Sequence, residues 1–199
     1  MMRPASAVLP LPEAERATIP SPGPGFEGLA WRPTVSFRNG AAWLSARAWR
    51  ANARRDQLAA IKLAKARVDA ATISAAAQDI AVVLEAVLGP APFVTCVPCG
   101  HSRRQDCFGF RLAEAVAAAA GATLVEGWRF RPVEGSSHPR RNATLPPLER
   151  ADDLSALPRP LVVVDDIATS GFHIVEALND ARAQGASALG AVWIKGTVA

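Results

Sequence analysis

Two adjacent carboxylates, Asp165 and Asp166, follow an apolar segment at residues 161–164. A turn of small residues, 168–171, comes next and leads into a segment with helical spacing that starts at Phe172. Backbone N–H groups at the start of a helix are unpaired and carry the positive end of the helix dipole, so they bind anions. Carboxylates beside such a turn can accept hydrogen bonds from sugar hydroxyls. The segment therefore predicts a site for a phosphorylated sugar.

The alternative for this segment is an ordinary strand-to-helix turn with solvated acids and a capping hydroxyl, because Asp, Thr, Ser and Gly are common in turns. The combination of an apolar strand, two acids, small hydroxylated residues and a helix favours the ligand-binding interpretation. The residues that this interpretation assigns to the site are Asp165, Asp166, Ile167, Ala168, Thr169, Ser170, Gly171, Phe172 and His173.

Strand-like and helix-like patterns alternate around this site. Strands are predicted at 93–97, 122–128, 161–164 and 188–195, and helices at 109–120 and 172–184. The run at 161–164 is apolar at every position, which is typical of a parallel sheet covered on both faces. We therefore expect an α/β fold in which helices flank a mainly parallel, twisted sheet.

The chain divides by composition into three parts. Residues 1–30 contain six prolines and predict an extended, disordered arm. Residues 31–90 predict a basic helical extension, with helices over 41–67 and 69–88. Residues 91–199 make up the predicted α/β core with the ligand site.

The segment from Leu161 to His173 resembles the ribose-phosphate signature of type I phosphoribosyltransferases. The resemblance implies that Asp165 and Asp166 hold the ribose hydroxyls of phosphoribosyl pyrophosphate (PRPP), and that residues 168–171 hold its 5′-phosphate. It also implies Mg²⁺ that rides on the substrate, with few protein ligands. His173 stands where the family often has Thr, and its side chain either donates to phosphate or faces solvent.

Val97-Pro98 after a strand and Gly109-Phe110 at the start of a helix resemble the ComF-like (competence protein F) branch of that family. The departures from that branch's pattern are Phe108, Arg111 and Leu112, in place of Arg, Asn and Gln. The resemblance extends over about residues 55–196. It implies transfer of phosphoribose to a nitrogenous acceptor with release of pyrophosphate, or a relative that binds PRPP without transfer.

The resemblance assigns the pyrophosphate to the loop after the first core strand and a mobile hood to the long loop at 129–158. The loop candidates are Pro98, Cys99, Gly100, Ser102, Arg103 and Arg104, and the hood candidates are Arg140 and Arg141. Cations there would stabilise the leaving group, while the two acids would stabilise an oxocarbenium-like ribose. The alternative for each arginine is a solvated surface charge.

Two other groups of residues could do chemistry. The first is a zinc site, which ligand type and proximity allow for Cys96, Cys99, His101 and Cys107. Its alternative is one buried cysteine with loop thiols. The second is the basic stretch at 31–67, in which Arg47, Arg50, Arg54 and Arg55 could contact DNA. Its alternative is an amphipathic helix with core tryptophans and solvated arginines. A non-catalytic, nucleic-acid-associated protein on the same fold is therefore the rival function.

Composition sets wider limits. The chain has 199 residues, a net charge of +4 and 50% hydrophobic residues, which excludes wholesale disorder. Three cysteines are too few for a disulfide framework. No signal peptide is recognisable, and no apolar run approaches the roughly 20 residues that span a bilayer. We therefore expect a cytoplasmic protein without membrane contact. A homodimer is compatible with this interpretation.

Overall fold

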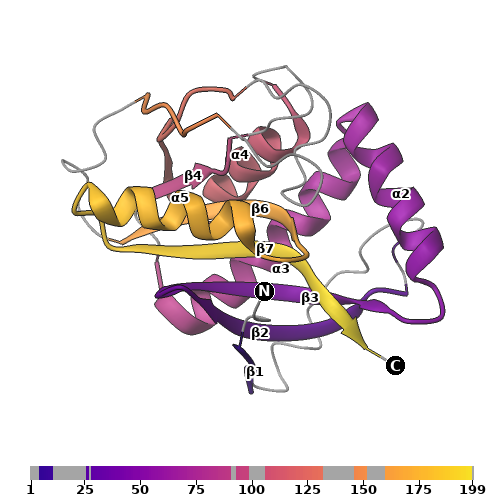
Figure 1. Cartoon of the computed structure of the whole chain (residues 1–199). Helices are drawn as coiled ribbons and strands as arrows, with labels where there is room; N and C mark the ends of the chain where they lie inside the picture. The colour runs from indigo at the N-terminus through magenta and orange to yellow at the C-terminus, as the bar shows by residue number, and fades with distance from the viewer. Residues whose placement is uncertain are drawn as a thin grey trace.

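The computed structural model of the chain describes residues 5–10, 26, 28–90, 93–98, 106–131, 146–151 and 160–198 (Figure 1). Within these residues it has seven strands and four helices. In chain order they are β1 (Ala5–Val8), β2 (Ala30–Arg38), β3 (Ala41–Arg50), α2 (Arg54–Arg67), α3 (Ala70–Leu88), β4 (Phe93–Cys96), α4 (Phe108–Ala120), β5 (Thr123–Leu124), β6 (Leu161–Ala168), α5 (Phe172–Ala183) and β7 (Ala188–Val198).

All seven strands belong to one sheet, in the order β1-β2-β3-β7-β6-β4-β5. The five strands from β3 to β5 in that order are parallel to one another, while β2 pairs antiparallel with both β1 and β3. The predicted α/β class and mainly parallel sheet are confirmed. The sheet includes strands from all three parts into which composition divides the chain.

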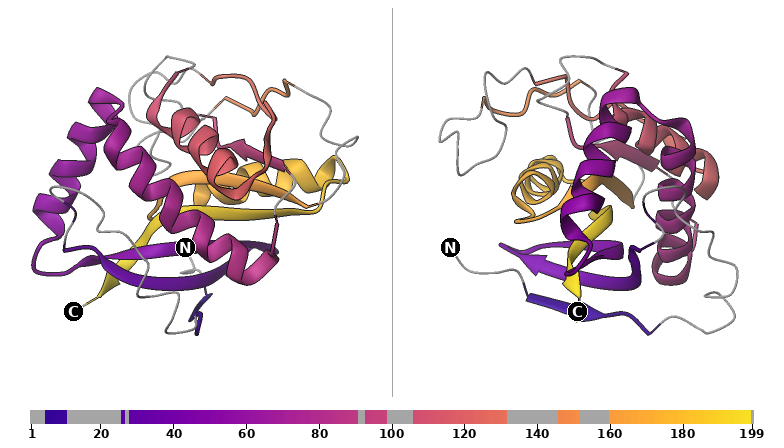
Figure 2. Two further views of the ribbon diagram at one scale, coloured as in Figure 1. Left: turned by 180° about the vertical axis from the view of Figure 1, so that it is seen from behind. Right: turned by 90° about the vertical axis from the view of Figure 1, so that its right-hand side faces the viewer.

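Helices cover both faces of the sheet. Helices α3 and α4 pack on one face and α5 packs on the other, so that the sheet lies between two helical layers (Figure 2). The chain leaves β4 through α4 toward β5 on one side, and leaves β6 through α5 toward β7 on the other. The direction of winding therefore reverses between β4 and β6. In open α/β sheets, ligands bind outside the carboxyl ends of the strands at such a switch point.

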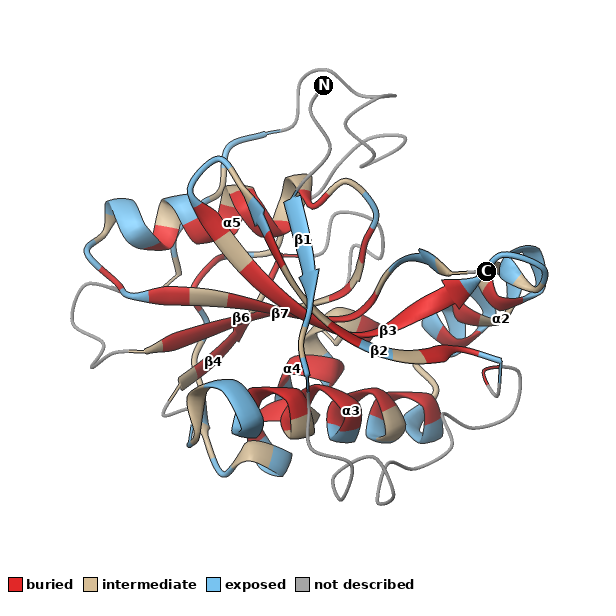
Figure 3. Cartoon of the chain, turned by 90° about the horizontal axis from the view of Figure 1, so that it is seen from below, coloured by how far each residue is buried: buried red, intermediate tan, exposed pale blue. Residues whose placement is uncertain are grey.

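The predicted helix over 41–67 is wrong in its first part. Residues 41–50 form strand β3, which pairs with β2 across a turn at Asn39 and Gly40, both with positive φ. Nearly every residue of β3 is buried, on both faces (Figure 3). A strand buried on both faces lacks the alternation of polar and apolar residues that marks a half-exposed strand, so its pattern was mistaken for a helix. Within the predicted arm, β1 pairs with β2, and residues 1–4, 11–25 and 27 lie outside the described residues.

Most other element predictions are confirmed to within a few residues. Helix α3 begins after the expected N-cap, Asp69, whose carboxylate accepts a hydrogen bond from the Thr72 backbone N–H at 2.8 Å. The strand expected over 122–128 is shorter, because β5 ends at Leu124 and the next pairing is an isolated bridge between Trp128 and Arg150.

A buried ion pair joins α3 to the sheet. The Arg47 guanidinium donates to both carboxylate oxygens of Asp79, at 2.5 and 2.8 Å, and the Trp193 indole N–H donates to the same carboxylate at 2.7 Å. Arg47 is 4% exposed, and its guanidinium lies 5.4 Å from the ring centroid of Trp31. Arg47 therefore belongs to the core. Arg47 is therefore not available for the DNA contact considered from the sequence, whereas Arg50, Arg54 and Arg55 are exposed.

Among the described residues, one helix, α3, is long and apolar enough to cross a bilayer by length and composition alone, with a mean hydropathy of 1.6. In this structure α3 packs against β3, β7 and α4, and 44% of its apolar window is buried inside the protein. The core helix of a folded domain passes the same test, so this finding is weak support for membrane insertion.

Candidate functional site

Strand β6 carries the two acids to the switch point of the sheet. It was expected to end at Val164, but it continues to Ala168 because Asp165, Ile167 and Ala168 pair with β7. On its other side β6 pairs with β4, and the Val97 N–H extends this pairing with a 2.9 Å bond to the Val164 carbonyl. The β4 pairing therefore ends directly before the two acids, and β7 alone pairs with the segment of β6 that carries them.

Asp166 is nearly buried and is paired with a lysine from a distant part of the chain. Its carboxylate Oδ2 lies 2.5 Å from Lys65 Nζ, in the last turn of α2. The Asp166 side chain is 9% exposed and that of Lys65 is 41% exposed. A carboxylate with so little contact with water needs a compensating charge, and Lys65 supplies it. Sequence reasoning missed Lys65, because nothing local links it to the second acid.

Asp165 is more exposed than Asp166, and its carboxylate Oδ1 accepts the Asp166 backbone N–H at 2.9 Å. Successive side chains of a strand point to opposite faces, so the two acids do not form a single carboxylate pair on one face. Together they can present acceptors on two sides of a ligand that lies across the end of β6.

The turn after β6 begins at Thr169, one residue later than expected. Thr169 is exposed, and Gly171 is the N-cap of α5 with φ +70°. A Cβ at Gly171 would lie 2.7 Å from Trp43 Cη2, which is closer than carbon atoms pack. Glycine is therefore required here twice, by the backbone conformation and by the Trp43 ring that packs against the turn. The expected phosphate-loop glycine thus also has a structural reason.

Two cations lie beside this turn that sequence reasoning did not assign to it. Arg38, at the end of β2, donates from Nη1 to the Ser170 carbonyl at 2.6 Å. Lys195 is the register partner of Ala168 on β7, and its ammonium lies 5.3 Å from the Trp43 ring centroid. Burial lowers the pKa of Lys195. The turn thus has positive charge on the β2 and β7 side, which suits an anionic ligand.

His173 lies in the first turn of α5 and contacts two charged residues. Its Nδ1 is 3.5 Å from Arg131 Nη2 and 4.0 Å from Glu176 Oε2. Arg131 is buried and holds both Glu176 carboxylate oxygens, each at 2.9 Å, and also donates to the Pro146 carbonyl. The His173 side chain is 27% exposed. The sequence left two roles open for His173, a phosphate donor or a solvated side chain. The structure adds contacts with Arg131 and Glu176, which orient the imidazole.

The two described ends of the loop expected to form the hood are tied to α5. The Arg129 N–H donates to the Glu149 carbonyl at 2.7 Å, next to the bridge between Trp128 and Arg150. The Trp128 indole N–H donates to Asp180 at 2.7 Å, and Arg150 lies 3.6 Å from the same carboxylate. The loop therefore leaves and rejoins the fold beside the helix that starts at the candidate phosphate turn.

Several predicted site residues lie outside the described residues. They are Cys99, Gly100, His101, Ser102, Arg103, Arg104, Arg140 and Arg141. Pro98 is buried directly after β4, at the position from which the expected pyrophosphate loop departs. Among the described residues, no group of three metal-binding side chains is found. Cys96 is half-buried in β4 and Cys107 is buried at the N-cap of α4. Because Cys99 and His101 lie outside the described residues, the choice between a zinc site and a buried cysteine with loop thiols stays open.

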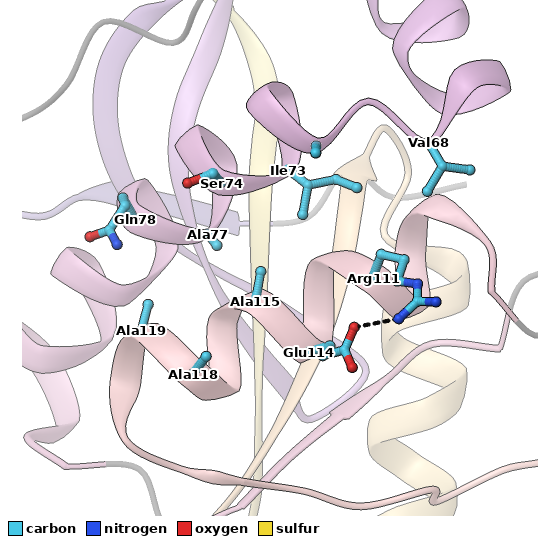
Figure 4. A pocket seen from close by; sticks show the side chains of 11 residues that line it. Val68, Ile73, Ser74, Ala77, Gln78, Arg111, Glu114, Ala115, Ala118 and Ala119 are labelled. Carbon is cyan, nitrogen blue, oxygen red and sulfur yellow. Dashed lines mark hydrogen bonds and ion pairs between the residues drawn. The ribbon is translucent and has the colours of Figure 1, made fainter.

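An open groove of about 640 Å³ lies between α3 and α4 (Figure 4). Alanines from both helices make up much of its lining, and an Arg111–Glu114 ion pair of 2.8 Å lies at its side. None of the predicted site residues lines it. The groove is therefore separate from the candidate site on β6.

No protein-family model matches the sequence, and no curated protein matches it.

Proposed function

We propose that this chain binds PRPP at the carboxyl end of β6 and acts as a phosphoribosyltransferase of type I, nearest to the ComF-like branch. The observation that carries the proposal is the position of the Asp165-Asp166 pair. It lies at the switch point of a parallel sheet, three residues before a turn whose Gly171 opens helix α5. Anion binding at the helix start and hydroxyl binding at the acids are then a few residues apart.

In this proposal each group acts through fixed charge. The backbone N–H groups of residues 169–171 hold the 5′-phosphate, and Asp165 and Asp166 accept hydrogen bonds from the ribose hydroxyls. As the bond to pyrophosphate breaks, the ribose gains positive charge, which the nearby carboxylates stabilise. Mg²⁺, when bound with the substrate, neutralises the pyrophosphate oxygens. The acceptor is a nitrogenous compound.

The first test is calorimetric titration with PRPP, with and without Mg²⁺, of the wild type and of the Asp165→Asn/Asp166→Asn variant. We expect binding by the wild type that Mg²⁺ strengthens, and none by the variant, because neutral amides are weaker acceptors than carboxylates for the ribose hydroxyls. The matched control is Glu85→Gln/Glu114→Gln, which removes two exposed carboxylates elsewhere and should bind like the wild type.

Folded wild-type protein that takes up no PRPP at millimolar concentration would refute the proposal. Should PRPP bind, release of pyrophosphate in the presence of candidate nitrogenous acceptors separates a transferase from a protein that binds PRPP without transfer. The same preparation, titrated with a DNA duplex at low and high salt, tests the rival function, which depends on exposed arginines and should weaken steeply with salt.

A further inference from the structure

The Lys65–Asp166 pair has a consequence for the proposed ligand site, and the inference below rests on the proposed function. We infer that Lys65 is a positioning residue and the built-in counter-ion of Asp166. In this role it takes the place that a divalent cation would occupy on that carboxylate.

The geometry supports this role. Lys65 Nζ lies 2.5 Å from Asp166 Oδ2 and occupies one of the directions from which a metal ion could bind that oxygen. The Asp166 side chain is 9% exposed, so a divalent cation at this oxygen would lie close to the ammonium and be repelled by it with little screening by water. Lys65 therefore opposes direct binding of a metal ion to Asp166 Oδ2.

The pair still leaves Asp166 able to bind a ligand. A carboxylate has two oxygens with about four acceptor directions, and Lys65 is bonded to Oδ2. The other oxygen can accept a ribose hydroxyl while the ammonium holds the carboxylate in one orientation. The ammonium also offsets the negative charge of Asp166, which would otherwise repel a phosphorylated ligand.

The end of α2 has a defined geometry, which holds Lys65 next to Asp166. Lys65 lies in the last turn of α2, which ends at Val68 in a left-handed conformation with φ +51° and then turns into α3. Asp69 N–H donates to the Ala64 carbonyl at 3.0 Å, which closes this end of α2. Lys62, three residues earlier on the same helix, is exposed and provides a matched control of the same type.

The first experiment uses Mn²⁺ alone as the probe and needs no PRPP. We expect Lys65→Met to bind Mn²⁺ about tenfold more tightly than the wild type, because loss of the ammonium leaves the Asp166 carboxylate without its counter-ion. Broadening of the Asp165 and Asp166 amide signals in NMR locates the ion. Lys62→Met and Lys65→Arg should behave like the wild type, and Lys65→Met/Asp166→Asn should lose the added affinity.

Mn²⁺ binding by Lys65→Met that is no tighter than that of the wild type would overturn the inference. Lys65→Gln, which keeps a polar end, serves if the Met variant unfolds, and its expected result is the same. The far-ultraviolet circular dichroism of each variant establishes that it is folded.

The second experiment tests the effect on the ligand. We expect Lys65→Met to bind PRPP about tenfold more weakly than the wild type without Mg²⁺ and to recover most of the loss with it, since the ion can replace the missing charge. Lys62→Met should bind PRPP like the wild type in both conditions. Equal affinity of Lys65→Met and the wild type without Mg²⁺ would contradict the positioning role. No binding by any form refutes the proposed function, and the Mn²⁺ experiment then decides the inference alone.

Discussion

The Arg47–Asp79 and Lys65–Asp166 ion pairs differ in burial and in the number of hydrogen bonds that the carboxylate accepts. Asp79 is buried and accepts three bonds, two from Arg47 and one from Trp193. Asp166 is nearly as buried, but its partner Lys65 is 41% exposed and makes one bond to it.

The difference separates a carboxylate whose hydrogen bonds are supplied by the fold from one that keeps acceptor capacity for a ligand. The Asp79 carboxylate accepts three bonds from two strands, β3 and β7, so it has little capacity left for a ligand. The Lys65 side chain is 41% exposed, so this pair is less enclosed than the Arg47–Asp79 pair. Burial of both partners with saturation indicates a role in stability, and burial of one partner at a switch point indicates a role in binding.

The largest effect should come from breaking the structural pair. Asp79→Ala leaves the Arg47 guanidinium and the Trp193 N–H buried without their partner, so we expect a loss of about 3–5 kcal/mol in the free energy of unfolding. Urea unfolding followed by circular dichroism measures it. In contrast, Asp166→Asn should lower the free energy of unfolding by less than about 1 kcal/mol, because the Lys65 side chain is 41% exposed and is not left buried.

A double replacement tests the cause of that loss. Arg47→Leu/Asp79→Leu removes both charges, and it should be more stable than Asp79→Ala, since no buried charge is then left uncompensated. Equal losses for Asp79→Ala and Asp166→Asn would break the comparison between the two pairs.

The next effect concerns the turn between β6 and α5. Gly171→Ala should lose about 1–3 kcal/mol of unfolding free energy for the positive φ alone, and more because the new Cβ would meet Trp43. Gly185→Ala is the matched control, since Gly185 has φ +88° and open space around its Cβ position. The difference between the two variants in urea unfolding measures the Trp43 contact. Losses of the same size would show that this contact adds nothing.

Local signals predicted the parts of the fold that lie around the acids. The unbroken apolar run at 161–164 identified β6, and the Asp69 cap identified the start of α3. These patterns depend on burial or on hydrogen bonds among neighbours in the chain, which sequence displays directly.

The errors come from positions that long-range packing decides. In β3 both faces are buried, so Trp43 and Trp49 do not alternate with polar residues. Only Asn39-Gly40, a typical hairpin turn, indicates the strand pair locally. The contact of Lys65 with Asp166 joins segments that are far apart in the chain, and it depends on where α2 lies against the end of β6. Only the folded arrangement brings such charges together.

The smallest expected effect is at Asp69, where the number of hydrogen bonds to a carboxylate can be separated from the burial of that carboxylate. Asp69 accepts two bonds from Thr72, at 2.8 Å from the N–H and 2.6 Å from the hydroxyl, but it is partly exposed. If burial decides the cost, Asp69→Ala should lose about 1 kcal/mol in urea unfolding at neutral pH, well below the loss for Asp79→Ala. Asp69→Asn, which can still cap the helix, should lose less.

The pH dependence of the same variants provides the check. The Thr72 hydroxyl and then its backbone N–H hold the pKa of Asp69 below its ordinary value of 3.8. Because the folded-state pKa is lowered, the stabilisation from the charged cap is complete above 3.8 and disappears as the pH falls through the lowered pKa. The gap between the wild type and Asp69→Asn should therefore narrow in acid. A gap that stays constant would mean that the charge of Asp69 adds nothing to the cap.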